Sequence, residues 1–175
     1  MASAFQYDYK LKNVDFSTWN FSNCTSMQYM FRSCSKLESV SLKGTSSKLT
    51  NLDSTFVSCY MIEEVNITDF DTTNVATFNN MFSGCTRLKK LTIPKNFIQS
   101  KATTMASMFN NISFLDSIDL SLSNPEKMAN FSSAFAGMKE LKTLILPSNF
   151  VQSSATNLSN MFNECRDLQS LDVSR

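Results

Sequence analysis

The chain has 175 residues, of which 42% are hydrophobic, and its 16 Lys and Arg residues against 15 Asp and Glu residues give a net charge of +1. Nucleic-acid-binding proteins normally carry a strongly positive surface, so this balance predicts that nucleic acid is not the partner. No apolar run reaches the roughly 18 residues that a membrane-spanning helix requires, so the sequence also predicts no membrane insertion.

One pattern of residues recurs along the whole chain at intervals of 25–27 residues. Its clearest member is a phenylalanine, which stands at Phe5, Phe31, Phe56, Phe82, Phe109, Phe135 and Phe162. Near-constant recurrence at this period is typical of stacked-repeat proteins, in which neighbouring coils bury one another. The sequence therefore predicts a single repeat domain over residues 1–175, with a partial N-terminal coil at about 1–16 followed by six coils of 25–27 residues.

The elements predicted within each coil come in a fixed order along the chain. Mostly apolar residues at the i, i+3, i+4 and i+7 spacing of one helix face occupy 27–34, 52–59, 78–85, 105–112, 131–138 and 158–165. Good helix N-caps stand directly before these segments, at Ser26, Asn51, Thr77, Thr104, Asn130 and Asn157. Apolar pairs with the two-residue spacing of a strand are found at 14–16, 40–42, 65–67, 91–93, 118–120, 144–146 and 171–173.

Two stretches carry a resemblance to a known family: DFSTWNFSNCTSMQYMFRSCSKLESVSL at 15–42 and NITDFDTTNVATFNNMFSGCTRLKKLTI at 66–93. They resemble the roughly 26-residue repeats of BspA-like bacterial surface proteins, the mycoplasma-lipoprotein-type relatives of leucine-rich repeats. The resemblance covers nearly the whole chain. It implies a surface-displayed adhesion or recognition module, of a kind also found in phage-borne proteins, and it brings no catalytic residues with it.

The predicted fold class is an α/β repeat solenoid, a leucine-rich-repeat-like right-handed coil with a parallel β-sheet on one face and short helices on the other. Helix axes pack about 8–10 Å apart and strands about 4.7–4.9 Å apart, so such a solenoid would curve with the strands on its inner face. A single-turn or 3₁₀ element in place of each helix would flatten the curve, and the sequence leaves this alternative open.

The candidate reactive residues favour packing over chemistry. The chain has no histidine, the commonest general base, and no glycine-rich phosphate loop, so the sequence predicts neither an enzyme nor a cofactor. One repeat position is shared by Cys34, Cys59, Cys85 and Cys165. Because Ile112 and Met138 also occupy it, we interpret the position as a small apolar slot for buried free thiols and predict no metal site. The disulfides Cys34–Cys59 and Cys59–Cys85 remain an alternative, which requires that the Cα atoms of each pair lie about 4.4–6.8 Å apart.

The outward positions of the predicted strands form the candidate partner-binding face: Asn13, Asp15, Ser39, Ser41, Glu64, Asn66, Lys90, Thr92, Ser117, Asp119, Thr143 and Asp172. Seven strands about 4.8 Å apart would make this face roughly 29 Å wide. Mostly short polar side chains suit hydrogen bonding to a protein or glycan, although exposed polar residues also occur without any function. Trp19, Phe70, Phe97 and Phe150 are expected to seal the coil edge, with Trp19 the candidate exposed aromatic.

Two functions remain from these observations. The first is a non-enzymatic recognition or adhesion module, which binds a host or partner protein or glycan through the strand face, at the cell surface or extracellularly as part of a longer chain. The alternative is a structural or assembly component, a spacer in a phage particle or a surface filament. Neither terminus supplies a polar capping coil, so end-to-end self-association or flanking repeats are also expected.

Overall fold

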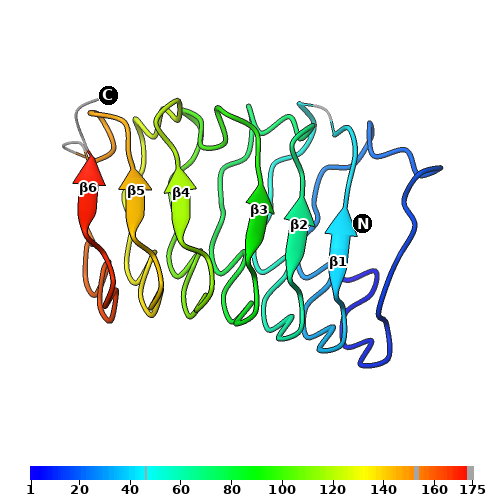
Figure 1. Ribbon diagram of the computed structural model, residues 1–175. Coiled ribbons are helices and arrows are strands. Elements are labelled where there is room, and N and C mark those ends of the chain that lie inside the picture. The colour runs from blue at the N-terminus through cyan, green and yellow to red at the C-terminus, as the bar shows by residue number, and fades with distance from the viewer. Residues whose placement is uncertain (46, 152–153, 173–175) are drawn as a thin grey trace.

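The computed structural model describes residues 1–45, 47–151 and 154–172 and shows a stack of coils with the strands side by side on one face (Figure 1). Each coil is a run of turns, a three-residue strand and a return loop. The strands are β1 (Ser39–Ser41), β2 (Glu64–Asn66), β3 (Lys90–Thr92), β4 (Ser117–Asp119), β5 (Thr143–Ile145) and β6 (Ser170–Asp172).

The predicted short helices are wrong: throughout the described residues, the segments expected to be helical are runs of hydrogen-bonded turns. In the first full coil, the N–H of Met30 donates to the carbonyl of Met27 at 3.0 Å, across three residues. Tyr29 and Ser33 have positive φ angles of 59°. A left-handed residue at every fourth position interrupts the i to i−4 hydrogen bonds of an α-helix, so the chain turns without becoming helical.

The remaining backbone groups of each turn run bond to the neighbouring coils. The N–H of Phe31 donates to the carbonyl of Thr55 at 2.8 Å, and the N–H of Ser33 donates to the carbonyl of Val57 at 2.8 Å. These bonds satisfy buried backbone groups that a helix would pair internally. Turns take the place of helices in the described coils. The predicted curvature depended on helices packed more widely than the strands, and these coils have no such helical layer.

Residues with a left-handed backbone, most of them Ser, Asn or Gly, explain why turns form where the apolar spacing indicated helices. The residues two before and two after each ladder phenylalanine have positive φ: Ser3, Tyr7, Tyr29, Ser33, Ser54, Ser58, Asn80, Gly84, Ser107, Asn111, Ser133, Gly137, Asn160 and Glu164. Glycine and asparagine adopt this conformation most readily. Because the turn pattern repeats every four residues, it keeps the same side chains inward as a helix would, and the apolar spacing alone could not separate the two.

The predicted N-cap residues begin these turns. All six form an unbroken series of parallel bridges from coil to coil: Ser26, Asn51, Thr77, Thr104, Asn130 and Asn157. The side chain of Asn51 accepts the N–H of Asp53 at 2.8 Å, and that of Asn130 accepts the N–H of Ser132 at 3.0 Å. The capping chemistry of Asn51 and Asn130 was therefore identified correctly, although the element that they cap is a turn. At Thr77 and Thr104 the N–H two residues later donates instead to Asp53 or Asn79 of the preceding coil.

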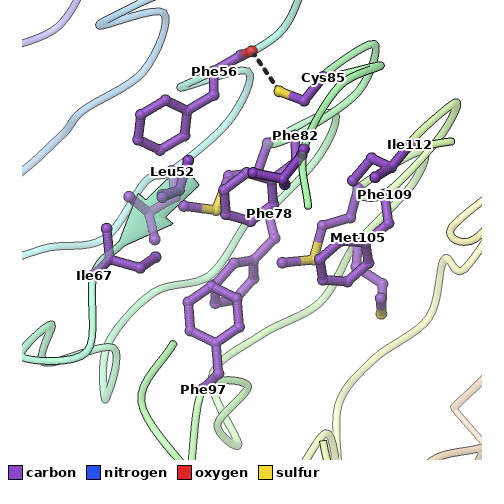
Figure 2. Close-up of a cluster of buried hydrophobic side chains, with 14 of the residues drawn as sticks. Leu52, Phe56, Ile67, Phe78, Phe82, Cys85, Phe97, Met105, Phe109 and Ile112 are labelled. Atoms are coloured by element: carbon purple, nitrogen blue, oxygen red, sulfur yellow. Dashed lines mark hydrogen bonds between the residues drawn. The ribbon is translucent and has the colours of Figure 1, made fainter. Parts of the chain in front are cut away.

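The predicted phenylalanine ladder is confirmed and forms the centre of the core. Adjacent rings stack with centroids 5.3–5.7 Å apart and interplanar angles of 3–12° from Phe5 to Phe162. Figure 2 shows Phe56, Phe82 and Phe109 in this core, beside Met105 and Ile112. Stacked rings add about 0.5–1.5 kcal/mol per pair to the free energy of area burial.

The strands form two parallel sheets, where the sequence predicted one. One sheet has the order β1-β2-β3 and the other β4-β5-β6, with the repeat positions in register, as in Val65 opposite Leu91 and Ile118 opposite Leu144. The strand predicted at 14–16 is irregular backbone. The predicted seven-stranded face is therefore, in the described residues, a six-stranded face with a break between β3 and β4.

Candidate partner-binding face

The structure places the predicted outward side chains on the strand side of the stack. Those of Asn13, Asp15, Ser39, Ser41, Lys90, Ser117 and Asp119 are exposed, and those of Glu64, Asn66, Thr92 and Thr143 are half-buried. Asp172 ends β6, and its side chain lies outside the described residues. Register pairing fixes these positions one repeat apart, which gives the face a regular spacing.

Two aspartates on the face are held by the turn that follows them. Asp15 accepts the N–H of Ser17 at 2.8 Å, and Asp119 accepts the N–H of Ser121 at 2.9 Å. The hydrogen bond from the backbone of Ser17 holds the pKa of Asp15 below its usual 3.8. Both carboxylates are thus oriented on the surface by a backbone donor of the turn that follows them.

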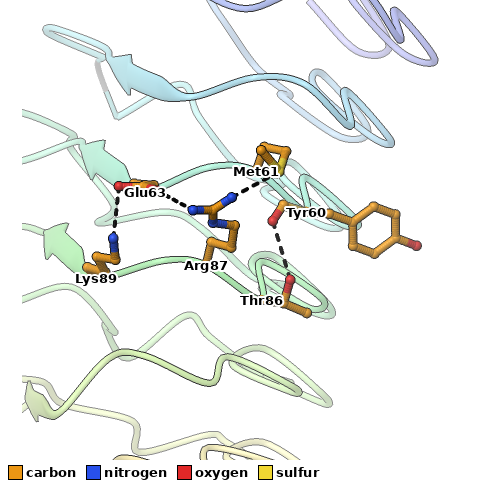
Figure 3. Close-up of polar contacts among 6 residues, drawn as sticks. All are labelled: Tyr60, Met61, Glu63, Thr86, Arg87 and Lys89. Carbon is orange, nitrogen blue, oxygen red and sulfur yellow. Dashed lines mark hydrogen bonds and ion pairs between the residues drawn. The ribbon is translucent and has the colours of Figure 1, made fainter.

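Ion pairs on the second and third coils neutralise the charges beside the face. Lys90 contacts Glu64 at 2.7 Å, and Glu63 contacts both Arg87 at 3.1 Å and Lys89 at 3.0 Å (Figure 3). The hydrogen bond and charge of Lys89 lower the pKa of Glu63. Exposed pairs of this kind add about 0–1 kcal/mol to stability, so their main effect is to leave the face without a strong field of either sign.

The break between β3 and β4 opens a cleft of about 450 Å³ in the face. Residues 91–95 form one wall and residues 117–119 with 121–122 the other, so the predicted Thr92, Ser117 and Asp119 come together there. A second cleft of about 230 Å³ lies between β1 and residues 13–17 and includes Asn13 and Asp15. The sequence did not predict either cleft, since the strand pattern of residues 91–93 and 118–120 matches that of paired strands.

Trp19 is 39% exposed and lies against the rings of Phe16, at 5.1 Å between centroids, and Phe5, at 5.9 Å. The other three loop aromatics are buried, as predicted: Phe70, Phe97 and Phe150. Four further exposed aromatics were not singled out in the sequence: Tyr7, Tyr9, Tyr60 and Phe114. Each stands outside the repeating apolar positions, which is the signal that could have identified them.

The five cysteines are free thiols; four are buried and Cys165 is half-buried, which confirms the predicted inward position. The thiols at the shared repeat position lie 3.0–3.2 Å from the carbonyl oxygen of the ladder phenylalanine one coil earlier. Figure 2 shows the contact between Cys85 and Phe56. Ile112 and Met138 cannot donate this hydrogen bond, so the fourth and fifth coils lack it.

Comparison with known families identifies the repeat. The family model described as "Mycoplasma protein of unknown function, DUF285" matches residues 1–119 and, in a second overlapping placement, residues 50–175. The chain belongs to the DUF285 family. This membership and the repeat fold of the Bacteroides structure described below confirm the resemblance to BspA-like, mycoplasma-lipoprotein-type repeats. No curated protein matches the sequence of this DUF285 chain.

Solved leucine-rich repeat proteins resemble the DUF285 chain. One from Bacteroides ovatus is 22% identical with a TM-score of 0.56, over 81% of this chain and 32% of that one. One from T. pallidum is 15% identical with a TM-score of 0.41, over 79% and 68%. A leucine rich cell surface protein from Faecalibacterium prausnitzii is 17% identical with a TM-score of 0.34, over 99% and 69%. The Bacteroides match shows a shared repeat fold, and this chain spans about a third of that protein's length.

The described residues include no cluster of three His, Cys, Asp or Glu side chains arranged to hold a metal ion. They also include no helix with the length and hydropathy needed to cross a bilayer.

The buried thiols of the DUF285 chain are expected to be alkylated slowly at about pH 8. Burial raises the pKa of Cys34 from 9.0 to about 11, and it raises the pKa values of Cys59 and Cys85 as well. Since the thiolate is the reacting form, the shift at Cys34 slows its reaction about a hundredfold. Iodoacetamide labelling read by mass spectrometry gives the rate at each site. Urea-unfolded protein is the control, and equal rates in both states would contradict the expectation.

Proposed function

We propose that this DUF285 chain is a non-enzymatic recognition module that binds a partner protein or glycan through its strand face. The module would be displayed at the cell surface or extracellularly, as part of a longer polypeptide. The observation that carries this proposal is the strand face itself, where small polar side chains stand in register and two clefts interrupt the row.

The physical features of the face support recognition. Ser39, Ser41 and Ser117 have short side chains that lose little rotamer entropy when a partner immobilises them. Register pairing already orders the backbone that carries them. Binding therefore loses little additional backbone entropy. The lack of histidine disfavours catalysis, and the repeat fold shared with the Bacteroides protein supports a non-enzymatic role.

Substitution of the face is expected to weaken partner binding. The variant Asn66→Arg/Thr92→Arg places two long cations in adjacent coils on the face, and it should weaken binding at least tenfold by steric and charge mismatch. The control variant Thr73→Arg/Thr103→Arg adds the same groups at exposed positions outside the strands and should bind normally. Glycan and extracellular-protein arrays followed by biolayer interferometry measure both. Binding that survives in the first variant, or arrays without any binder, would contradict the proposal.

A second candidate function, an assembly or spacer component, is favoured by the C-terminal end of the stack. An apolar cleft of about 420 Å³ lies there between residues 146–151, 158–162 and Leu171. Val151, Leu158 and Leu171 are 43–47% exposed. Exposed apolar patches are typical of interaction sites, so this end would stack on another copy or on further repeats. Light scattering across protein concentrations tests the idea: a monomer at every concentration, unchanged in Leu158→Glu, would exclude self-assembly.

A further inference from the structure

The break between β3 and β4 leaves two parallel strand edges facing each other across a cleft. In the described part of the chain, neither a register pair nor a backbone hydrogen bond joins these two strands. Figure 1 shows that the interval between them is wider than the intervals within either sheet. An unpaired strand edge is a template for another strand, and here two such edges face one space.

The same two coils are closely paired on their other sides. The rings of Phe82 and Phe109 stack with centroids 5.7 Å apart. The N–H of Phe82 donates to the carbonyl of Met108 at 2.9 Å, and Thr77 forms a parallel bridge with Thr104. The opening is therefore a wedge confined to the strand side, in a stack whose core is continuous.

The alternation of backbone groups along each strand directs hydrogen-bonding groups into the wedge. The N–H of Lys90 donates to the carbonyl of Glu63 at 3.1 Å, towards β2. The next residue, Leu91, therefore directs its N–H and C=O to the opposite side, into the cleft. Ser117 holds the position in β4 that Lys90 holds in β3, so its backbone groups point back across the cleft towards β3.

We propose that this cleft binds an extended peptide segment, which inserts as an additional parallel strand between β3 and β4 and joins the two sheets into one. The inference rests on the proposed recognition function and specifies its site and its class of partner. Strand addition to an exposed edge is a general mode of peptide recognition, in which backbone hydrogen bonds provide affinity and side-chain pockets provide specificity. A strand inserted between two edges would gain hydrogen bonds on both sides.

The walls of the cleft define the peptide. The inward residues on either side of the cleft are Leu91 and Ile118. Leu91 is half-buried, whereas Val65, its equivalent in the preceding coil, is fully buried. The central residue of the peptide should therefore be apolar, to complete the inward row. Lys95 and Asp119 bring one charge of each sign, which favours a peptide of low net charge. A glycan lacks the alternating N–H and C=O groups that match both edges, so the edges favour a peptide.

The test uses an acetylated and amidated peptide of residues 140–146, Glu-Leu-Lys-Thr-Leu-Ile-Leu, which carries the repeat's own strand pattern. A fluorescein-labelled form is titrated with the full chain, and amide hydrogen exchange of the complex is followed by NMR. We expect saturable binding with at least tenfold slower exchange at Leu91 and Ser117. A control peptide N-methylated at the residues that correspond to Thr143 and Leu144 keeps the side chains but loses two backbone donors. It should bind at least tenfold more weakly.

A matched pair of protein variants locates the site. Ser117→Pro removes the N–H that faces the cleft and should weaken binding at least tenfold. Glu126→Pro makes the same backbone change at an exposed turn position outside the strands and both clefts, where proline is well tolerated, and should leave binding unchanged. Far-UV circular dichroism checks that each variant folds. Where Ser117→Pro does not fold, the methylated peptide and the exchange data still decide the result.

Three outcomes would overturn the inference: no peptide binding, binding indifferent to N-methylation, or protection at the apolar C-terminal end without protection at Leu91 and Ser117. The recognition function is judged separately. A partner whose binding is lost in Asn66→Arg/Thr92→Arg but retained in Ser117→Pro would support the strand face and reject peptide insertion.

Discussion

Truncation of Phe82 to alanine is expected to lower the free energy of unfolding by about 3–5 kcal/mol. Its ring is fully buried between those of Phe56 at 5.5 Å and Phe109 at 5.7 Å, so the substitution leaves a cavity in two coil interfaces at once. Urea unfolding followed by far-UV circular dichroism measures the loss as a shift in midpoint. Because Phe82 couples neighbouring coils, the loss is also expected to weaken cooperativity along the stack.

The fluorescence of Trp19, the single tryptophan, tests that second effect, because it reports on the first coils alone. In the Phe82→Ala variant its transition should separate from the circular dichroism transition. Phe114→Ala is the matched control: that ring is 45% exposed, and its removal should change stability by no more than about 0.5 kcal/mol. Similar losses in the two variants would show that the stacked ladder is not the main source of stability.

Substitution of Gly137 by alanine is expected to destabilise the chain by about 2–5 kcal/mol. Its φ of +74° disfavours any side chain, and a Cβ would clash with Oδ1 of Asn111 and lie 3.2 Å from the Cα of that residue. The left-handed backbone costs about 1–2 kcal/mol for alanine, and overpacking adds about 1–3 kcal/mol. Urea denaturation again provides the measurement.

Gly84 is the internal control for this effect, because it holds the same repeat position with a φ of +75°. Its Cβ would lie 3.5 Å from the nearest atom, the Cα of Ser58, which is ordinary contact. Gly84→Ala should therefore cost only the backbone strain, about 1–2 kcal/mol. Replacing Asn111 by serine recreates the Ser58 arrangement beside Gly137→Ala and should restore part of the lost stability. Equal costs at the two glycines would show that contact with Asn111 is unimportant.

The regular repeat and the local break between β3 and β4 have different roles in this molecule. Regular coils build a continuous core, as the phenylalanine ladder shows from Phe5 to Phe162. The opening occurs on the strand side alone, between coils that stay paired at Thr77 and Thr104. A site placed there would gain its rigidity from the core and its specificity from one local irregularity, an arrangement typical of binding sites on repeat scaffolds.

The sequence by itself determined the repeat, its register and its core. Phe56, Phe82 and Phe109 recur at a period that leaves one efficient way to bury them, coil upon coil, and the inward cysteines and outward serines follow from the same alignment. Family membership could also be predicted from the sequence, because the combined spacing of several residue types is far more specific than leucine periodicity alone.

Only the tertiary structure decided between helix and turn and located the break in the sheet. The apolar spacing of residues 27–34 suits both a helix and a run of turns, and the choice depends on left-handed residues such as Ser33, whose backbone bonds go to the next coil. The cleft depends on whether β3 approaches β4, although both have the pattern of paired strands. Pairing between coils is a long-range property, set by how whole coils pack, and a local sequence pattern does not contain it.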